Sequence, residues 1–418
     1  MAQVQASKAR GRSLWRNQAY MLLWGGQVVS AVGTQVSDLA LPLLVLYLTG
    51  SPAQAGLVGA LGALPFVIFC LPAGALVDRW DRKRVMIICD SVRVLALGSL
   101  PLAYVLGHLT LIQIYLVALI EGTFFVFFSL AEVSALPAVV SKEDLPGVSA
   151  RVELTNSIAF LLGRALGGTL YGLGRVLPFL ADALSYLASV ISLCFIRVPF
   201  QGKRAVQRRK LLVEIGEGIH WLWKQPFLCF LALEGGVVHV VGAGAALLVI
   251  VIAQDLHAPA FVIGLILGAD GLGTLAGALL GGLLQKRWPF SLLLLGSMWL
   301  MGLFCLLYLW TPNVVWLALV GVILAVVMTL YGVIQFSYRL GRIPDELQGR
   351  VNSVYRLVVW GGDPVGLALT GFLLQFWNVQ GVVLVYASSL LLLAAGATLS
   401  RKVRSLRSIM ASAEVANA

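Results

Sequence analysis

One twelve-residue stretch occurs twice in this chain of 418 residues, and the repetition constrains the fold more than any other feature. Residues 73–84 read AGALVDRWDRKR and residues 276–287 read AGALLGGLLQKR, so six of twelve positions match at an offset of 203. In both copies an apolar segment rich in small residues runs into a basic turn. A repeat at about half the chain length predicts two related structural units.

A second pair of short segments repeats at nearly the same distance. Glu143–Gly147 reads EDLPG and Asp345–Gly349 reads DELQG, at an offset of 202. Because the two offsets agree within one residue, they indicate a duplication of the whole half rather than two chance matches.

The composition indicates that both units lie in a membrane. Hydrophobic residues make up 59% of the chain, charged residues only 12%, and the mean hydropathy is +0.91. A soluble domain carries roughly 25% charged residues. Continuous apolar runs of about 20 residues predict membrane-spanning helices rather than barrel strands, which alternate polar with apolar residues. Twelve spans are predicted, at about 20–47, 54–77, 85–106, 110–137, 154–174, 178–198, 227–252, 260–284, 289–310, 314–336, 352–376 and 380–400.

The basic residues gather on one side of these predicted spans. Of the 30 Lys and Arg residues, 27 flank that side, Arg175 alone lies on the other, and Arg93 and Arg164 lie within spans. By the positive-inside rule both termini are cytoplasmic, in a multi-pass protein of the plasma or inner membrane. This distribution explains the net charge of +11 without a nucleic-acid partner. The surrounding partner is the lipid bilayer.

The predicted fold is an all-α membrane protein with twelve transmembrane helices in two six-helix, pseudo-symmetric halves. The halves are residues 1–198 and 227–418, joined by a cytoplasmic linker at 199–226. The linker begins with the basic run GKRAVQRRK and continues with Leu212, Ile215, Ile219 and Leu222 at helical spacing. We therefore expect an amphipathic helix at the membrane interface that tethers the halves.

The sequence contains no pattern typical of an enzyme or of a cofactor site. The five cysteines fall inside predicted spans without paired spacing, and no phosphate-binding loop of the G-x-x-x-x-G-K-[ST] type is present. We expect no metal, no cofactor, no enzymatic activity and a monomeric chain.

Ionisable residues at membrane depth are the candidate functional residues, because each costs roughly 2.5–3.5 kcal/mol at mid-bilayer on insertion scales. Transporters place substrate sites at this depth, between their repeats. Gln27, Thr34 and Asp38 form a polar stripe on one face of the first span and add further candidates. The predicted substrate- and proton-binding residues are Gln27, Thr34, Asp38, Glu121, Arg164, Glu234, His239, Asp270 and Asp363.

Several of these residues also have a structural interpretation. Arg164 and Glu121 lie on consecutive spans and could neutralise each other, and Asp90 and Arg93 are placed for a local pair. Asp182, near a span end, could reach headgroup water. His239 and Glu234 fit a packing role as well as a functional one.

The basic turn after the second span has a local role that follows from its residues. Asp81 is placed to cap the third span, and the neighbouring basic side chains can pair with carboxylates or helix C-termini. The spacing of Gly74, Asp78, Arg79, Arg82 and Lys83 also resembles the signature between helices two and three of the major facilitator superfamily.

The start of the first span, Leu23–Gln27, is similar to twelve-helix exporters of that superfamily, including macrolide-efflux and siderophore-export relatives. Two positions depart from the superfamily pattern: Asp81 replaces a glycine, and Ala118 stands where drug–proton antiporters carry an arginine. The resemblance implies alternating access and a cytoplasmic gate formed by Gly74, Asp78, Arg79, Arg82 and Lys83.

Together these features predict a secondary active transporter that exports small amphiphilic molecules of a drug or macrolide type in exchange for protons. Desolvated carboxyl groups favour the protonated form, and an adjacent cation expels the proton. One alternative is an exporter of a specific metabolite or siderophore, because Arg164 offers a cation to an anionic group. A second alternative is a membrane receptor or scaffold that transports nothing.

Overall fold

The computed structural model describes residues 17–77, 79–140, 145–198, 200, 211–344 and 347–399, and every regular element in these ranges is a helix. Six long helices come first. They are α2 (Gln18–Thr49), α3 (Pro52–Val77), α4 (Arg82–Val105), α5 (Leu111–Val139), α6 (Leu145–Leu173) and α7 (Leu177–Phe195).

A short helix, α8 (Leu211–Trp223), separates this first group from a second one. The second group consists of α9 (Pro226–Asp255), α10 (Ala260–Leu284), α11 (Phe290–Cys305) with the 3₁₀ turn η3 (Leu306–Leu309), α12 (Val314–Leu340), α13 (Gln348–Trp360), α14 (Gly362–Phe376) and α15 (Val379–Leu399).

Side chains that accept backbone hydrogen bonds begin several of these helices. Asn17, Thr110 and Asn313 each accept from the N–H three residues later, and so satisfy a donor that has no partner within the helix. Asp81 does the same for α4, accepting from the Arg84 N–H at 3.1 Å. The predicted cap at Asp81 is therefore confirmed.

The described helices contain eleven segments long and apolar enough to cross a membrane, with α13 and α14 counted as one. The sequence predicts twelve. The remaining helix, α6, runs through the bundle between α2 and α10, but Asn156, Arg164 and several glycines lower its hydropathy. Its Arg164 lines the cavity between the helices, as expected of a charged residue at this depth.

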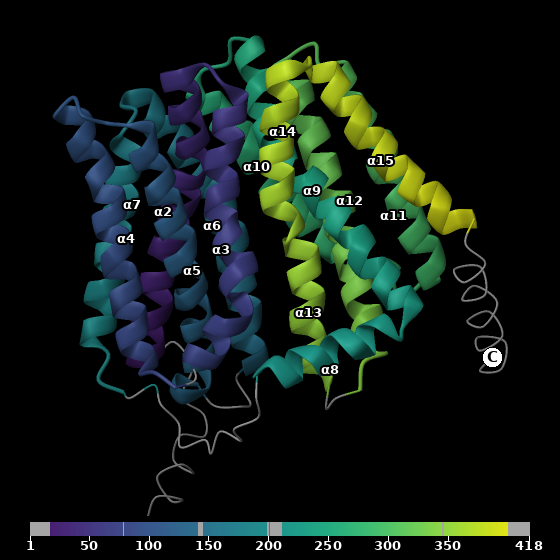
Figure 1. Ribbon diagram of the computed structural model, residues 1–418, viewed down its shortest axis with the longest axis horizontal. Coiled ribbons are helices and arrows are strands. Elements are labelled where there is room, and N and C mark those ends of the chain that lie inside the picture. Colours follow the sequence, from purple (N-terminus) through teal and green to yellow (C-terminus); the bar gives the residue numbers. More distant parts are fainter. Residues whose placement is uncertain are drawn as a thin grey trace, which may run out of the picture.

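The helices before and after α8 form two groups that lie side by side (Figure 1). Within the first group α2 packs on α6 and α7, and α4 packs on α5 and α7; within the second, α10 packs on α12 and α9 packs on α14. Two helix pairs, α3 with α14 and α6 with α10, join the groups. The exact boundaries at 198 and 226 remain predictions, since residues 201–210 lie outside the described part of the chain.

The first seam between the groups is a backbone contact of α3 with α14. A Cβ added at Gly56 would lie 2.4 Å from the Leu367 carbonyl oxygen, and one at Gly371 would lie 2.4 Å from that of Pro52. Both glycines lie within the five or so residues nearest one end of their helices. Only glycine permits this approach.

The second seam, of α6 with α10, repeats the same contact. A Cβ at Gly168 would lie 2.3 Å from the Ala260 carbonyl oxygen, and one at Gly264 would lie 2.4 Å from that of Arg164. Both glycines again lie close to the helix ends opposite α8 (Figure 1). The two groups are therefore held together at one end of the bundle by two equivalent glycine pairs.

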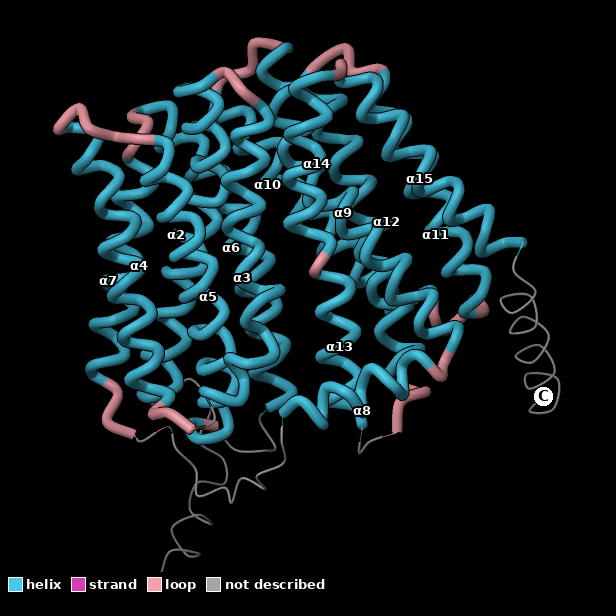
Figure 2. The backbone as a smooth tube through the Cα atoms, viewed as in Figure 1, coloured by secondary structure: helices cyan, strands magenta, loops and turns pink. Residues whose placement is uncertain are grey.

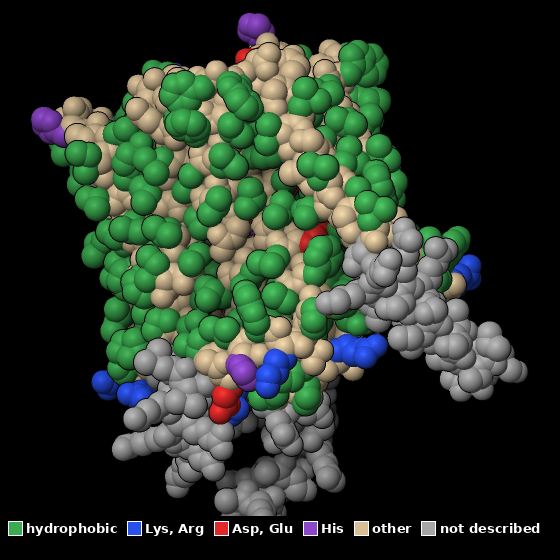
Figure 3. Space-filling view, turned by 45° about the vertical axis from the view of Figure 1, so that its right-hand side comes forward, with side chains coloured by type: hydrophobic (Ala, Val, Ile, Leu, Met, Phe, Trp, Pro, Cys, Tyr) green, Lys and Arg blue, Asp and Glu red, His purple; other side chains and the backbone are tan. Residues whose placement is uncertain are grey.

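We call this end the far end, and the end that holds α8 the basic end. In Figure 3 hydrophobic side chains cover most of the side wall, while Lys and Arg side chains appear at the basic end. This apolar wall fits a hydrocarbon environment. The all-helical transmembrane prediction is confirmed.

The eleventh predicted span is broken. Helix α13 ends at Trp360, and α14 begins at Gly362 after a single turn residue, Gly361 (Figure 2). Pro364 follows in the first turn of α14, where a missing N–H costs nothing. The break lies near the middle of the span and places Asp363 beside it.

Helix α8 lies within the linker segment in which an amphipathic helix is expected, and its placement at the membrane interface stays a prediction. It packs on the basic end of α13, where a Cβ at Gly218 would lie 2.8 Å from the Arg350 carbonyl oxygen. The Arg350 guanidinium also pairs with the Glu217 carboxylate. Helix α8 is therefore attached to the second group.

Candidate functional site

A cavity of about 690 Å³ lies between the two groups, and helices of both groups line it. Most of its wall is apolar, including the aromatic rings of Phe66, Phe125, Phe160 and Trp360. Eight ionisable side chains also line it: Asp38, Arg93, Glu121, Arg164, Asp182, His239, Asp270 and Asp363. The cavity thus combines a large apolar surface with charges at membrane depth.

The cavity brings together most of the residues predicted to bind substrate or protons. These are Thr34, Asp38, Glu121, Arg164, His239, Asp270 and Asp363. The polar stripe on α2 reaches it only in part, because Gln27 is not among the lining residues. Glu234 also lies outside the lining. The roles of these residues stay predictions.

Arg93 is the centre of a polar network inside the first group. Its Nε donates to Glu121 Oε2 at 2.8 Å, and its guanidinium also bonds the Tyr186 hydroxyl. Tyr186 in turn lies 2.8 Å from the Thr34 hydroxyl, and Asp90 lies 3.6 Å from Arg93. We call these five residues the Arg93 network; it connects α2, α4, α5 and α7.

This network corrects one interpretation of the sequence. Glu121 pairs with Arg93 rather than with Arg164, because α4 packs directly on α5, while Arg164 on α6 lies beside Gln35 of α2. The expected Asp90–Arg93 pair is present, but Arg93 makes a shorter contact with Glu121.

Asp182 is likewise not at the headgroups. Its side chain is fully buried, and it accepts a hydrogen bond from the Ser185 hydroxyl at 3.0 Å. Gly33 on α2 makes room for it, because a Cβ there would lie 2.4 Å from Asp182 Oδ1. The interpretation as a water-exposed residue is wrong, since α2 covers this face of α7.

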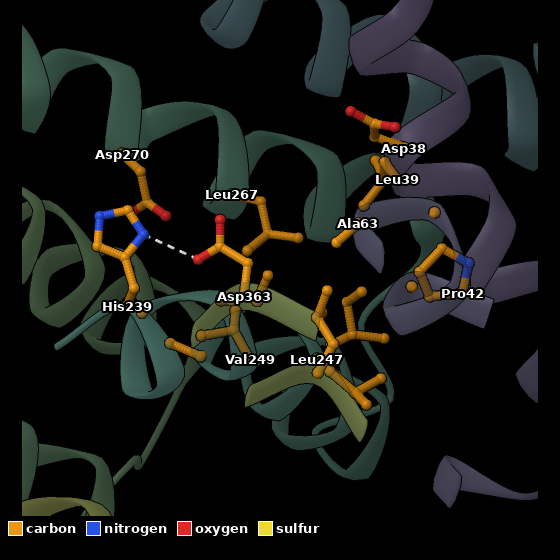
Figure 4. A pocket seen from close by; sticks show the side chains of 18 of the residues that line it. Asp38, Leu39, Pro42, Ala63, His239, Leu247, Val249, Leu267, Asp270 and Asp363 are labelled. Atoms are coloured by element: carbon orange, nitrogen blue, oxygen red, sulfur yellow. Dashed lines mark hydrogen bonds and ion pairs between the residues drawn. The ribbon is translucent and has the colours of Figure 1, made fainter. Parts of the chain in front are cut away.

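Arg164 stands between carboxylates of the two groups. Its guanidinium lies 3.7 Å over the Phe160 ring, and its Nε lies 3.4 Å from the Gln35 amide oxygen. It interacts electrostatically with Asp38 on α2 and with Asp270 on α10. We call Arg164, Asp38 and Asp270 the Arg164 cluster. Asp38 and Asp270 lie on different helices around the cavity (Figure 4).

A carboxylate–imidazole pair lies in the second group. His239 Nδ1 on α9 is 2.8 Å from Asp363 Oδ1 on α14, and the two side chains point toward each other in Figure 4. Both are about one third exposed, although they lie at membrane depth. Both residues line the cavity, so both can meet a solute there.

Trp360 places an aromatic surface beside this pair. Its ring lies roughly parallel to that of His239, with the ring centres 6.2 Å apart. Phe66 of α3 contacts the same ring from the other group at 5.0 Å, and Arg356 lies 4.9 Å above it. Rings of this kind bind flat apolar groups and cations.

Glu234 belongs to a separate polar network near the basic end of the second group. It is buried, and its Oε2 accepts from the Gln335 amide at 3.0 Å. Gln335 also bonds the hydroxyls of Tyr331 and Tyr355, and Arg339 lies 4.0 Å over the Tyr355 ring. This placement favours the structural interpretation of Glu234.

The predicted gate residues are only partly described. Lys83 Nζ donates to the Ile196 carbonyl at 2.6 Å, and Arg82 donates to that of Ser134 at 2.9 Å. The turn is thus tied to the ends of α7 and α5, in agreement with the expected pairing with helix C-termini. Arg79 is exposed, and a Cβ at Gly74 would meet no atom within 4 Å. Asp78 lies outside the described residues, so its predicted latch role stays a prediction.

Some lining residues were not predicted. Tyr186, Phe66 and Tyr308 became candidates only when the helices were placed in space, since an aromatic residue in an apolar run has no distinctive pattern. Arg93 did carry a signal, a charge within a span, but was assigned to a local pair.

Long membrane-spanning helices in two groups around a central, mainly apolar cavity with charged side chains are the arrangement of a membrane transporter. The chain belongs to the transmembrane secretion effector family of the major facilitator superfamily, whose family model matches residues 11–417. It is therefore a transporter of this superfamily and not an enzyme.

Curated relatives cover most of the chain. The enterobactin exporter EntS of Salmonella choleraesuis is 28% identical over 390 residues, which cover 90% of this chain and 92% of the relative. EntS of Citrobacter koseri is 29% identical over 392 residues, with the same coverage.

Solved structures share the fold at low identity. A bacterial homologue of the iron transporter ferroportin, in an inward-facing state, superposes with a TM-score of 0.71 at 16% identity and covers 92% of this chain and 98% of its own. The nucleoside transporter NupG superposes with a TM-score of 0.71 at 14% identity, covering 90% and 98%.

Proposed function

We propose that this transporter exports small amphiphilic molecules by alternating access and is driven by the proton gradient. The cavity between the groups carries this proposal. Its volume of about 690 Å³ suits a drug-sized molecule. It has both an apolar aromatic wall for a lipophilic body and charges for a polar group.

The balance of charge in the cavity favours cations and protons. Five carboxyl groups (Asp38, Glu121, Asp182, Asp270 and Asp363) line it against two guanidinium groups, Arg93 and Arg164. Arg93 already pairs with Glu121. The remaining excess of carboxyl groups supports competition between protons and a cationic amphiphile for the same site.

The placement of charge and of the seams supports an export cycle that begins at the basic end. The positive-inside rule makes the basic end cytoplasmic. The glycine pairs close the far end, while α3 and α13 diverge toward the basic end (Figures 1 and 2). The structure then corresponds to an inward-facing state that loads substrate from the cytoplasm.

Transport by reconstituted protein tests the proposal. Liposomes with an imposed pH gradient are challenged with cationic, neutral and anionic amphiphiles of similar size, and protein-free liposomes are the control. We expect uphill accumulation of the cationic members that a protonophore abolishes. Accumulation that the protonophore does not change contradicts proton coupling. A failure to move any member of the panel favours export of a specific metabolite or siderophore.

A second candidate function is export of a siderophore. The enterobactin exporters that resemble this chain over nine tenths of its length support it, and Arg164 offers a cation to an acidic group. Adding enterobactin to the same panel separates the candidates. Transport of enterobactin alone favours this candidate, while transport of several unrelated amphiphiles favours the first.

A further inference from the structure

We propose that Arg164 changes its carboxylate partner as the far-end seam opens and closes, and that Asp270 is the group that takes up the coupling proton. In the closed seam Arg164 faces Asp270 of the other group. In the open seam it keeps only Asp38 of its own group. This inference rests on the proposed function, because it assigns the proton site within the proposed antiport cycle.

Arg164 is part of the seam itself. It lies one helical turn before Gly168, and its carbonyl oxygen is the atom that a Cβ at Gly264 would meet. Asp270 lies on α10, less than two turns after Gly264, so both side chains reach the same part of the cavity. Separation of α6 from α10 must therefore separate these two charges.

Asp38 behaves differently because it belongs to the same group as Arg164. Helix α2 packs along α6, and the Gln35 amide of α2 already lies 3.4 Å from Arg164 Nε. A rigid movement of the two groups leaves this neighbourhood unchanged. A cation buried at this depth needs a counter-charge in both states, and Asp38 supplies it when Asp270 is withdrawn.

The groups that face Asp270 agree with a proton site. From α6 comes Arg164, from η3 comes the Tyr308 hydroxyl, and from α9 His239 lines the same cavity. On α12, Gly321 leaves space for the carboxylate, since a Cβ there would lie 2.7 Å from Asp270 Oδ1. Arg164 is the cation whose charge acts on this carboxyl group, and it lies on the helix that the seam moves.

The sequence of events follows from these positions. With the seam open, Asp270 loses its cation and binds a proton from the far side. Closure returns Arg164 to Asp270, and the proton leaves the carboxyl oxygen for water in the cavity, which now faces the basic end. The restored attraction then holds the empty carrier closed until a substrate competes for Arg164 or Asp270.

A distance measurement without substrate tests this switch. Spin labels are attached at Leu173→Cys on α6 and Phe261→Cys on α10, both exposed at the far end, in a variant without the five native cysteines. The distance between the two labels measures the separation of α6 from α10. For the otherwise unchanged protein we expect a short distance at high pH and a growing long-distance population as the pH falls, because protonation of Asp270 removes the attraction.

Three substitutions separate the roles within the Arg164 cluster. Asp270→Asn and Arg164→Gln are expected to show the long distance at every pH and to lose the pH response. Asp38→Asn is expected to keep the short distance and to lose most of the long-distance population. Asp255→Asn, which removes an exposed carboxylate at the far end of α9, is the control and should match the unchanged protein.

The inference and the proposed function can fail separately. An Asp270→Asn protein that keeps the full pH response overturns the inference even if proton-driven export is observed. Conversely, the expected distances together with a lack of proton-driven transport support the switch and contradict the proposed function. Asp270→Glu, which restores the carboxyl group, should recover the pH response and so separates loss of charge from misfolding.

Discussion

The guanidinium of Arg93 holds four helices together through charged and polar contacts inside the first group. The distance between Arg93 Nε and Glu121 Oε2 is short, and the Arg93 side chain is almost fully buried. The Tyr186 hydroxyl links the network to Thr34 on α2. A buried ion pair adds little net stability over apolar packing, but loss of one partner leaves the other charge stranded. We therefore assign the Arg93 network mainly to the structure of the first group.

Substitution of Arg93 is accordingly expected to be costly. Arg93→Ala should lower stability by about 3–5 kcal/mol, because Glu121 then stays buried without its cation. Thermal unfolding in detergent measures this effect. Arg84→Ala is the matched control, since that side chain is 83% exposed and its pair with Asp81 is long; it should change stability by less than about 1 kcal/mol. Equal losses in the two variants would contradict the assignment.

Two carboxylates of the second group, Asp363 in the cavity lining and Glu234 outside it, allow the role of the cavity to be tested. Glu234→Gln should leave transport intact, since Glu234 bonds Gln335 away from the cavity. Asp363→Asn should reduce uphill transport, because it removes the charge beside His239. Initial rates in the same liposomes compare the two. A larger effect at Glu234 than at Asp363 would mean that the transport route passes elsewhere.

At the level of helices, two glycine contacts of the same kind close the far end, one between α3 and α14 and one between α6 and α10. Gly56 and Gly264 occupy equivalent positions near the starts of α3 and α10, and Gly168 and Gly371 near the ends of α6 and α14. Each pair brings backbones together where even one methyl group has no space. The two seams are thus related to each other in the same way as the two halves of the duplicated sequence.

An alanine at one seam should therefore keep the far end from closing. Gly168→Ala places a Cβ against the Ala260 carbonyl, whereas Gly172→Ala, one turn further along α6, meets no atom within 4 Å. We expect the first variant to increase thiol labelling of a cavity cysteine from the far side, and the second to behave like the unchanged protein. Equal labelling of both variants would exclude a gate at this seam.

At the level of the whole molecule, one chain encloses the entire cavity. We propose that the monomer is the transport unit, and co-reconstitution with the Gly168→Ala variant tests this. Activity should fall in direct proportion to the fraction of active protein. A steeper fall would indicate that neighbouring chains cooperate.

Much of this arrangement could be predicted from the sequence, for identifiable reasons. Long apolar runs are a local property, so the all-α membrane fold could be predicted from them. The pairing of Arg93 with Glu121 and the seating of Asp182 behind α2 depend on which helices become neighbours. Local periodicity does not contain that information, and both interpretations needed correction.

The break in the eleventh span has a consequence for how the two membrane faces are sealed. Beyond Gly361, α14 carries Gly371 and packs on α3 at the far end; before it, α13 carries Trp360, meets Phe66 and bears α8. One membrane-spanning segment therefore contributes α14 to one membrane face and α13 to the other. If the turn at Gly361 bends, α13 can move at one membrane face while α14 keeps its contact with α3 at the other.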